Sequence, residues 1–418
     1  MKARLAVAVV IAAALAVGVA ACGGSGTAST GKASVSTLTI YSSLPLQGTS
    51  RVDSVAINQG AQLALSALGG KIGKHTIALK PLDDSTAAAG KWDPFQTTND
   101  AHTACDNSST IGYLGELNSD ASAISIPILN RAGIVQISPT NTAIGLTANM
   151  PGAGPDEPRK YYPTGRRTYA RVVPNDAVQA AAQVALQKSE RCTKTYVVND
   201  REMYGVGLAK NFQLAAPSQG LSVAGNQGYD PKAANYRSLA ASAARTGANC
   251  VFISAIAENN AAQMTRDMAA AMPKAKIFGP ARVAKSTYYD PSKGGIPTSL
   301  DSRVFLTMST LAPTAYPPAG RAFFKSYQAK YGTPEPYAIY GYAAMSLMLD
   351  AIKRATKNGT AAPQRSKVIS AIFSTKDLPS VLGTYSINSN GDTTVTDYGS
   401  YKVVNGKLVF LKTITAVV

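Results

Sequence analysis

The order of strand-like and helix-like segments constrains the fold of this chain more than any other feature of its sequence. Short apolar runs alternate with segments whose apolar residues recur at helical spacing, and the alternation restarts after a Pro- and Gly-rich stretch at residues 151–165. Such alternation favours a parallel sheet with helices on both faces. Because the pattern occurs twice, we predict an α/β fold with two doubly wound lobes of similar build.

The expected elements fall into three blocks along the chain. The first block has strands at 38–41, 77–80, 110–114 and 134–137, separated by helices at 59–68, 98–105 and 120–132. The second has strands at 195–198, 221–224, 250–253, 276–278 and 304–308, with helices at 204–215, 236–246 and 260–272. Two late helices are expected at 319–331 and 337–356, before terminal strands at 382–388, 400–404 and 407–413. The Asn-Gly pairs at 390–391 and 405–406 fit hairpin turns.

The N-terminus has the composition of an export signal. Lys2 and Arg4 precede an apolar run at residues 5–17, and small residues then precede Cys22. A basic start, an apolar run and a small-residue cleavage site are typical of a signal peptide, here residues 1–21, and the run is too short for an ordinary membrane span. The cysteine at the cut resembles the lipobox of bacterial lipoproteins, which implies acylation of Cys22. The alternative is an ordinary signal peptide with an incidental cysteine.

The segment after the signal indicates where the mature protein resides. Residues 22–36 are mostly Gly, Ser, Thr and Ala, which predicts a flexible tether. More than one acyl chain on a residue gives stable membrane attachment. We therefore expect an extracytoplasmic protein that is lipid-anchored to the cell membrane, with a remaining length that suits two domains.

The charge of the chain does not indicate nucleic-acid binding. The formal net charge is +17, and removal of Lys2 and Arg4 with the signal lowers it by two. The cations are scattered, without a basic run or interleaved aromatic residues, so we expect no nucleic-acid partner. A basic exported protein suits anionic lipid head groups and wall polymers.

Residue patterns that would indicate catalysis or metal binding are missing from the sequence. It has two histidines, no Cys/His grouping with zinc spacing, and no G-x-S-x-G or Walker A pattern. Residues 388–392 (NSNGD) hint at a calcium loop but lack the glutamate that would complete it, so they fit a turn. We expect no enzyme activity, no cofactor and no metal.

Several short segments together resemble a known family. Their order along the chain is specific, although each one alone is weak: 40–48, 59–64, 82–85, 132–141, 171–176, 198–200, 204–209, 340–342 and 390–392. The set resembles the leucine/isoleucine/valine-binding-protein branch of type I periplasmic binding proteins. These are receptors of branched-chain amino acid ABC transporters. The resemblance covers nearly all of residues 37–415.

The resemblance implies a domain organisation and a function. Lobe one would comprise residues 37–170 plus 313–382, and lobe two residues 171–312 plus 383–418, joined by three crossing segments that act as a hinge. A small polar solute would bind in the cleft and promote hinge closure. We expect a monomeric receptor that delivers an amino acid to an ABC permease, with branched-chain amino acids among the candidates. The alternatives are a sensor subunit of the same fold, and a receptor for an amide or an organic acid.

The same resemblance implies ligand-binding residues. Ser119 matches a serine that holds the ligand carboxylate, and Thr140, Asn141 and Thr142 match the loop that shares this role. Hydroxyl and backbone N–H groups suit a carboxylate because they give charge-assisted hydrogen bonds. Tyr204 matches a tyrosine of lobe two at the start of a helix.

One departure from the family pattern bears on the ligand. Amino acid receptors of this branch hold the ligand ammonium with a glutamate after a Gly-Pro pair, whereas here Ala281 and then Arg282 follow that pair. Glu258, from a shifted position, or Asp53, from lobe one, would then have to supply the carboxylate. Otherwise the ligand lacks an ammonium, because a buried unpaired ammonium is costly.

The cysteines after Cys22 predict one disulfide. Cys192 and Cys250 each stand at or just before the start of a strand of lobe two. In a doubly wound order the first and third strands are neighbours, about 4.8 Å apart, within reach of a bridge. We therefore expect a Cys192–Cys250 disulfide, and a free thiol at Cys105.

Overall fold

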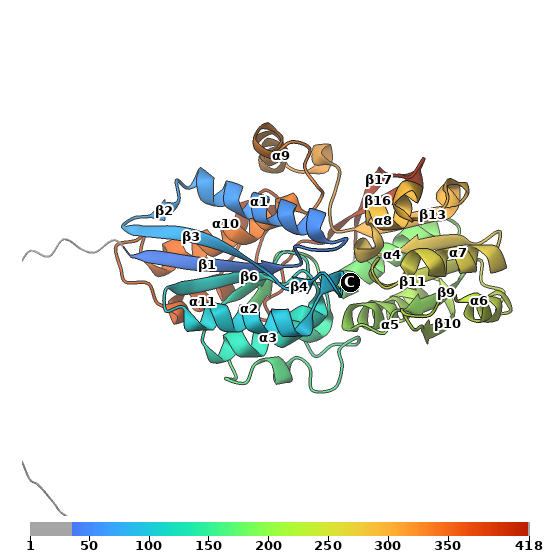
Figure 1. Ribbon diagram of the computed structural model, residues 1–418, viewed down its shortest axis with the longest axis horizontal. Helices are drawn as coiled ribbons and strands as arrows, with labels where there is room; N and C mark the ends of the chain where they lie inside the picture. The colour runs from blue at the N-terminus through green and yellow to red at the C-terminus, as the bar shows by residue number, and fades with distance from the viewer. Residues whose placement is uncertain (1–35, 417–418) are drawn as a thin grey trace, which may run out of the picture. The chain divides into compact units, whose positions relative to one another are not determined.

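The protein consists of two α/β lobes, each built around its own sheet (Figure 1). The computed structural model describes residues 36–416, so the expected signal, the tether and Cys22 lie outside the described residues. Both sheets are mainly parallel, as the alternation in the sequence predicts. Within residues 36–416, no helix combines the length and the apolar character that crossing a bilayer requires.

The first sheet has six strands in the order β2-β3-β1-β6-β7-β8. All neighbours are parallel except the short β2, which pairs antiparallel with β3. Its strands are β1 (Thr37–Leu44), β2 (Lys71–Ile72), β3 (His75–Asp83), β6 (Thr110–Gly115), β7 (Gln136–Ser138) and β8 (Tyr169–Arg171). A separate small hairpin joins β4 (Ser85–Thr86) to β5 (Lys91–Trp92).

Helices cover both faces of the first sheet. Helices α1 (Arg51–Ala67) and α10 (Ala338–Ala355) pack together on one face, and α2 (Pro94–Asp106) and α3 (Ser119–Arg131) on the other (Figure 1). The two faces divide the core, because Ile40 and Leu114 pack with the first pair whereas Tyr41 and Tyr113 pack with the second. Helices α9 (Pro318–Tyr331) and α11 (Arg365–Phe373) complete this lobe.

The second sheet has seven strands in the order β10-β9-β11-β12-β13-β16-β17. The first five are parallel, and β16 and β17 form an antiparallel edge that turns at Asn405–Gly406. The strands are β9 (Lys194–Asn199), β10 (Ser222–Gly228), β11 (Cys250–Ser254), β12 (Lys276–Gly279), β13 (Val304–Met308), β16 (Asp397–Val404) and β17 (Lys407–Thr415).

Alternate residues of the second sheet pack against different helices. Val197 and Phe252 lie in the cluster that contains α4 (Asp176–Ser189) and α5 (Met203–Ser218). Val198 and Ile253 instead join the cluster that contains α6 (Arg237–Ala244) and α7 (Ala261–Ala271), as the period of two in a strand requires. The short helix α8 (Ser286–Tyr289) follows β12.

The chain passes between the two lobes three times. It leaves the first lobe after β8, returns to it after β13 with helices α9, α10 and α11, and enters the second sheet again at β16. The hairpin of β14 (Leu378–Ser380) and β15 (Gly383–Tyr385) precedes the last crossing. The lobe boundaries at 170, 312 and 382 remain predictions, whereas the two-lobe α/β fold is confirmed.

The sequence interpretation missed several local features. Helices α4, α8 and α11, strand β8 and the short strands β2, β4, β5 and β14 were not expected, and the strand expected at 382–388 is only the short β15. The inward residues of α4 are mainly alanine and glutamine, so its apolar period is weak. Its start signal was nevertheless present, because Asn175 accepts hydrogen bonds from the N–H groups of Ala177 and Val178 as an N-cap does.

A disulfide joins Cys192 to Cys250 at the start of the paired strands β9 and β11, with Cα atoms 5.8 Å apart. Among the described residues, Cys105 is the free cysteine.

We expect Cys105 alone to react when the oxidised, delipidated protein is unfolded without reductant. Three reactive thiols would contradict the bridge. Replacing Cys192 and Cys250 by serine should cost about 4 kcal/mol of stability, because the bridge closes a long loop.

Candidate functional site

A small cavity lies where the two lobes meet. Its volume is about 10 Å³, room for about one water molecule. The lining residues are Leu117, Asn118, Ser119, Thr140, Thr142, Tyr204, Ile256 and Arg282. They follow the carboxyl ends of β6, β7, β9, β11 and β12, and ligands of open α/β sheets bind at this edge.

Helix α3 begins at the wall of this cavity, and the N-terminus of a helix favours an anion. Asn118 is the N-cap residue and makes no side-chain capping hydrogen bond, so the first N–H groups of α3 are not capped by it. Ser119 begins the helix, is buried, and its Oγ accepts a 3.4 Å hydrogen bond from the N–H of Ala143. Because a helix N-terminus carries partial positive charge, this end of the cavity suits a carboxylate.

The loop after β7 is tied to the loop after β6 by side chains of Thr140 and Asn141. Thr140 Oγ1 donates to the carbonyl of Leu117 at 2.7 Å, and Asn141 Nδ2 donates to the carbonyl of Glu116 at 3.0 Å. Thr140 lines the cavity, whereas Asn141 lies outside it. The structure therefore places Asn141 where it positions the loop, and leaves Thr140 and Ser119 at the cavity wall.

Thr142 connects the cavity wall to the second lobe. Its side chain lines the cavity, and its carbonyl accepts a 2.8 Å hydrogen bond from the N–H of Asp176, the first residue of α4. Burial raises the pKa of Asp176 to about 7, although hydrogen bonding with Thr142 and the charge of Arg171 act in the opposite direction.

Tyr204, near the start of α5, is the aromatic residue of the lining. Its hydroxyl accepts a 3.0 Å hydrogen bond from Gln179 Nε2, and burial raises its pKa well above the usual value. Because the hydroxyl is already held by Gln179, the ring is the part of Tyr204 available to a ligand.

Arg282 is the charged residue of the lining, and it is buried at 4% exposure. Its Nη2 donates to Ser50 Oγ at 3.1 Å, and its Nη1 lies 3.8 Å from Asp53 Oδ2. Asp53 forms its closest ion pair with Lys285. The guanidinium therefore reaches from lobe two to the start of α1 without a full ion pair of its own.

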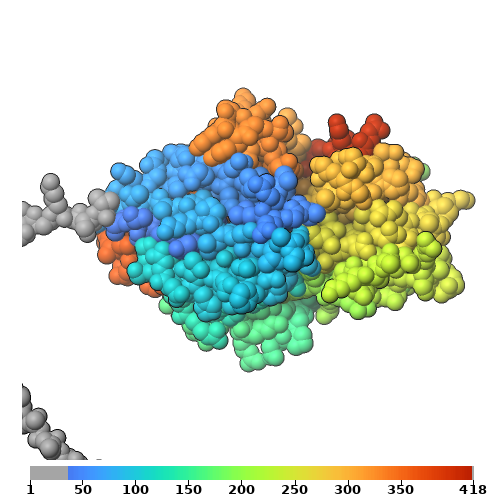
Figure 2. Space-filling view, in the orientation of Figure 1, coloured from blue at the N-terminus to red at the C-terminus, as the bar shows by residue number. Residues whose placement is uncertain are grey.

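Glu258 and Asp53, the two carboxylates considered from the sequence, do not line the cavity. Glu258 Oε1 accepts hydrogen bonds from Thr49 Oγ1 at 2.5 Å and Ser50 Oγ at 2.6 Å. These bonds join the lobes, and Figure 2 shows the blue surface of the first lobe against the yellow surface of the second. Within residues 36–416, the wall of this cavity therefore contains no carboxylate.

Further polar contacts join the two lobes beside the cavity. Lys91 Nζ pairs with Glu202 Oε1 at 2.6 Å, and Asp120 Oδ1 accepts a 2.9 Å hydrogen bond from the N–H of Met203. Burial raises the pKa of Asp120 to about 7, and the charge of Glu202 adds to this shift. The sequence interpretation missed these contacts, because no local pattern indicates which charges meet across a cleft.

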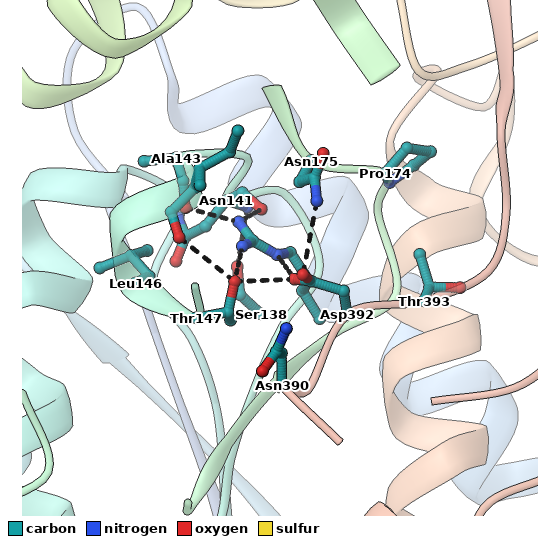
Figure 3. Close-up of polar contacts among 12 residues, drawn as sticks. Ser138, Asn141, Ala143, Leu146, Thr147, Pro174, Asn175, Asn390, Asp392 and Thr393 are labelled. Carbon is teal, nitrogen blue, oxygen red and sulfur yellow. Dashed lines mark hydrogen bonds and ion pairs between the residues drawn. The ribbon is translucent and has the colours of Figure 1, made fainter. Parts of the chain in front are cut away.

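A buried ion pair joins Arg171, the last residue of β8, to Asp392, which lies between β15 and β16 (Figure 3). Arg171 Nε contacts Asp392 Oδ1 at 2.6 Å, and Arg171 Nη1 donates to the carbonyls of Asn141 (3.1 Å) and Ala143 (2.9 Å). Thr147 also contacts both charged groups. The pair thus fixes the backbone on both sides of Thr142.

The turn that carries Asp392 depends on a glycine. Gly391 has φ +96°, and its carbonyl accepts a 2.9 Å hydrogen bond from the N–H of Arg171. A Cβ atom at this position would lie 2.2 Å from the carbonyl oxygen of Tyr169. The Asn-Gly-Asp segment therefore belongs to the crossing between the lobes. It closes on an isolated bridge between Ile387 and Thr393 instead of joining two long strands.

Comparisons with known proteins agree with this architecture. The family described as periplasmic binding protein matches residues 37–407. A leucine/isoleucine/valine-binding protein homologue of Brucella melitensis is 22% identical over 379 residues, which cover 90% of this chain and 94% of the homologue.

Solved structures show the same fold. The leucine-binding protein LivK of Thermotoga maritima superimposes with a TM-score of 0.73 at 20% identity, over 90% of this chain and 99% of its own. A solute-binding protein of an ABC transporter from R. palustris, in complex with benzoate, gives 0.71 at 19% identity, over 91% and 97%.

Proposed function

The chain belongs to the periplasmic binding protein family, and on that basis we propose that it is the extracytoplasmic solute receptor of an ABC importer. The observation that carries this proposal is the cavity between the lobes, lined by side chains from both. Its position at the carboxyl ends of five parallel strands is where such sheets bind ligands. The fold is that of receptors, and the role of delivering solute to a permease rests on the family.

We propose that the lobes separate to admit the ligand. The cavity of about 10 Å³ is smaller than any amino acid or aromatic acid, so the present arrangement is closed. Opening would break the hydrogen bonds of Glu258 with Thr49 and Ser50 and the ion pair of Lys91 with Glu202. Because the chain crosses between the lobes three times, hinge motion is the natural route to opening.

We propose a small solute with a carboxylate as the ligand. Ser119, Thr142 and the N-terminus of α3 supply donors for this group. An amino acid was the first expectation from sequence and an organic acid or amide the second. Similar solute-binding proteins of both kinds are known, since one was solved in complex with leucine and another in complex with benzoate.

A ligand screen followed by a transport assay tests the receptor role. Thermal shift with amino acids, amides and organic acids should identify a binder, because a ligand at 100 times its Kd stabilises by about 2.7 kcal/mol. The loaded protein should then stimulate the ATPase of its permease in proteoliposomes. A tight ligand without any stimulation would favour a sensor subunit of the same fold.

Removing a hydroxyl from the cavity wall should weaken binding. Each of Ser119→Ala and Thr142→Ala removes a hydrogen-bond donor for a charged group, so we expect affinity to fall about 10- to 150-fold in calorimetry. Ser189→Ala, at the far end of α4, is the matched control. If both cavity variants bind the identified ligand as tightly as the wild type, the proposed roles of Ser119 and Thr142 are wrong.

Replacing Tyr204 should affect closure of the lobes, which is measured separately from affinity. As a lobe-two residue it should contribute after the ligand has bound lobe one. Tyr204→Ala should therefore reduce the ligand-induced compaction seen in small-angle scattering.

We propose that the protein is anchored through an acylated Cys22. This residue lies outside the described part of the chain, so the proposal rests on the signal pattern alone. Mass spectrometry of the mature N-terminus should find acyl chains on the cysteine. An unmodified N-terminus that begins at another residue would show that the cysteine is incidental.

A further inference from the structure

Arg282 presents unused hydrogen-bond donors at the cavity. Its Nε and Nη1 are buried and have no hydrogen-bond partner among residues 36–416, although the side chain is only 4% exposed. A buried guanidinium with open donors is costly unless an acceptor reaches it. Because Arg282 lines the cavity, the acceptor that a bound ligand would bring can supply what is missing.

The acids nearest to Arg282 are already engaged elsewhere. Asp53 Oδ2 forms a close ion pair with Lys285, and Glu258 Oε1 is held by the hydroxyls of Thr49 and Ser50. Glu258 Oε2 is buried and has no hydrogen-bond partner within the described chain, and Glu258 is not among the residues that line the cavity. Within residues 36–416, the lining contains one cation and no carboxylate.

The remaining lining favours an acid with an apolar body. Ser119, Thr142 and the N-terminus of α3 supply donors, and Leu117, Ile256 and the ring of Tyr204 supply apolar surface. These donors and Arg282 line the same cavity, whose volume is about 10 Å³. A single carboxylate can therefore contact lobe one through the hydroxyls and lobe two through the guanidinium.

We propose, on the basis of the receptor function above, that the ligand is a carboxylic acid without an ammonium group. Its carboxylate lies between the hydroxyls of Ser119 and Thr142 and the guanidinium of Arg282, and this contact favours closure. An ammonium beside that carboxylate would face Arg282, a like charge, and would find no acid in the lining. A buried ion without a partner is strongly disfavoured, so α-amino acids should bind poorly.

Matched pairs of acids test the ligand class. Each pair shares its carbon skeleton and differs in the ammonium: L-leucine and isocaproate, L-phenylalanine and hydrocinnamate, L-glutamate and glutarate. In calorimetry with the full mature chain, we expect at least one ammonium-free acid to bind at least tenfold more tightly than its amino acid partner.

Variants of Arg282 test the residue. Arg282→Gln should weaken binding of the preferred acid about 10- to 150-fold, and Arg282→Lys should restore part of it because the charge returns. Arg266→Gln is the matched control, since Arg266 lies on α7 and donates to Gln263 and to the carbonyl of Gly295 outside the cavity. Thermal unfolding without ligand shows whether each variant remains folded.

The outcomes separate the two proposals. One outcome would overturn the inference and leave the receptor function intact. In it, an amino acid binds more tightly than the ammonium-free acid of its pair, Glu258→Gln abolishes that binding, and Arg282→Gln does not affect it. Failure of every acid and every amino acid in the panel to bind would contradict the receptor function, and with it the inference. Both proposals are supported if the protein prefers an ammonium-free acid, if Arg282→Gln removes this preference, and if Glu258→Gln leaves it in place.

Discussion

Replacing Asp392 by alanine is expected to lower the free energy of unfolding by about 3–5 kcal/mol. The side chain of Arg171, its partner, is 0% exposed, and that of Asp392 is 7% exposed. Removal of the carboxylate would leave the guanidinium of Arg171 buried without a counter-charge. An uncompensated charge in the interior strongly destabilises the folded state, because the group has lost its hydration and gains no ion pair in return. The midpoint of urea unfolding should report the loss.

A surface ion pair provides the matched control. Arg354 Nε and Asp350 Oδ2 are 2.8 Å apart, but their side chains are 37% and 31% exposed. Asp350→Ala should therefore cost about 0–1 kcal/mol, since exposed pairs contribute little. Equal losses for Asp350→Ala and Asp392→Ala would show that burial of the Arg171–Asp392 pair has no special effect.

The double variant identifies the source of the expected loss. If the unpaired guanidinium of Arg171 is responsible, adding Arg171→Met to Asp392→Ala should recover part of the stability. Recovery should be incomplete, because Arg171 also holds the carbonyls of Asn141 and Ala143. Those carbonyls flank Thr142, so the double variant should still bind ligand more weakly than the wild type.

The two sheets could be predicted from the sequence because their signal is local. Runs such as 110–114 and 304–308 are apolar on both faces and separated by helical periods, and they form β6 and β13. Helix α4 was missed because alanine and glutamine fill most of its inward positions, which leaves little contrast between its faces. Ser119, Thr140, Thr142 and Tyr204, which the family resemblance implied, line one cavity together with Arg282, which departs from the family pattern.

The pairing of charges across the lobes could not be predicted in this way. Thr49 and Glu258 are 209 positions apart, and Arg171 and Asp392 are 221 positions apart. Which of several acids meets which cation depends on how the lobes pack, and no local pattern encodes it. Asp53 and Glu258 were therefore reasonable candidates for an ammonium site until Lys285, Thr49 and Ser50 were placed beside them.

A cluster of buried acids lies next to the loop that follows β7, because Asn141 of this loop donates to the carbonyl of Glu116. Asp84 and Glu116 are 0% exposed, and Asp100 lies close by. Tyr113 donates its hydroxyl to Glu116 Oε1 at 2.9 Å, and Ser43 donates to Asp100 Oδ2 at 2.8 Å. Burial raises the pKa of Glu116 to about 8 and that of Asp100 to about 6, and burial beside Glu116 raises the pKa of Asp84 as well.

These shifts predict that stability falls as pH rises. The folded protein keeps the proton of Glu116 up to a pKa of about 8, whereas the ordinary value of this group, which the unfolded chain has, is 4.5. Between these values the folded state binds more protons, so the free energy of unfolding should decrease by about 1.4 kcal/mol per pH unit for each such group. Urea unfolding from pH 5 to pH 8 should show this slope, which is about 4 kcal/mol over the range for one proton.

Glu116→Gln separates the cluster from the other acids of the protein. The amide resembles the protonated acid in shape and charge, so the variant should be more stable than the wild type at pH 8 and should have a flatter pH profile. Asp84→Asn should act in the same direction, whereas Glu190→Gln, which removes a partly exposed ion pair with Lys276, should leave the slope in place. An unchanged slope in Glu116→Gln would mean that the cluster is not protonated in the folded state. A flatter slope would also bear on the site, because the carbonyl of Glu116 accepts hydrogen bonds from Ser138, at the end of β7, and from Asn141, in the loop that follows. Deprotonation of the cluster at high pH should then weaken ligand binding together with stability, and Glu116→Gln should protect both.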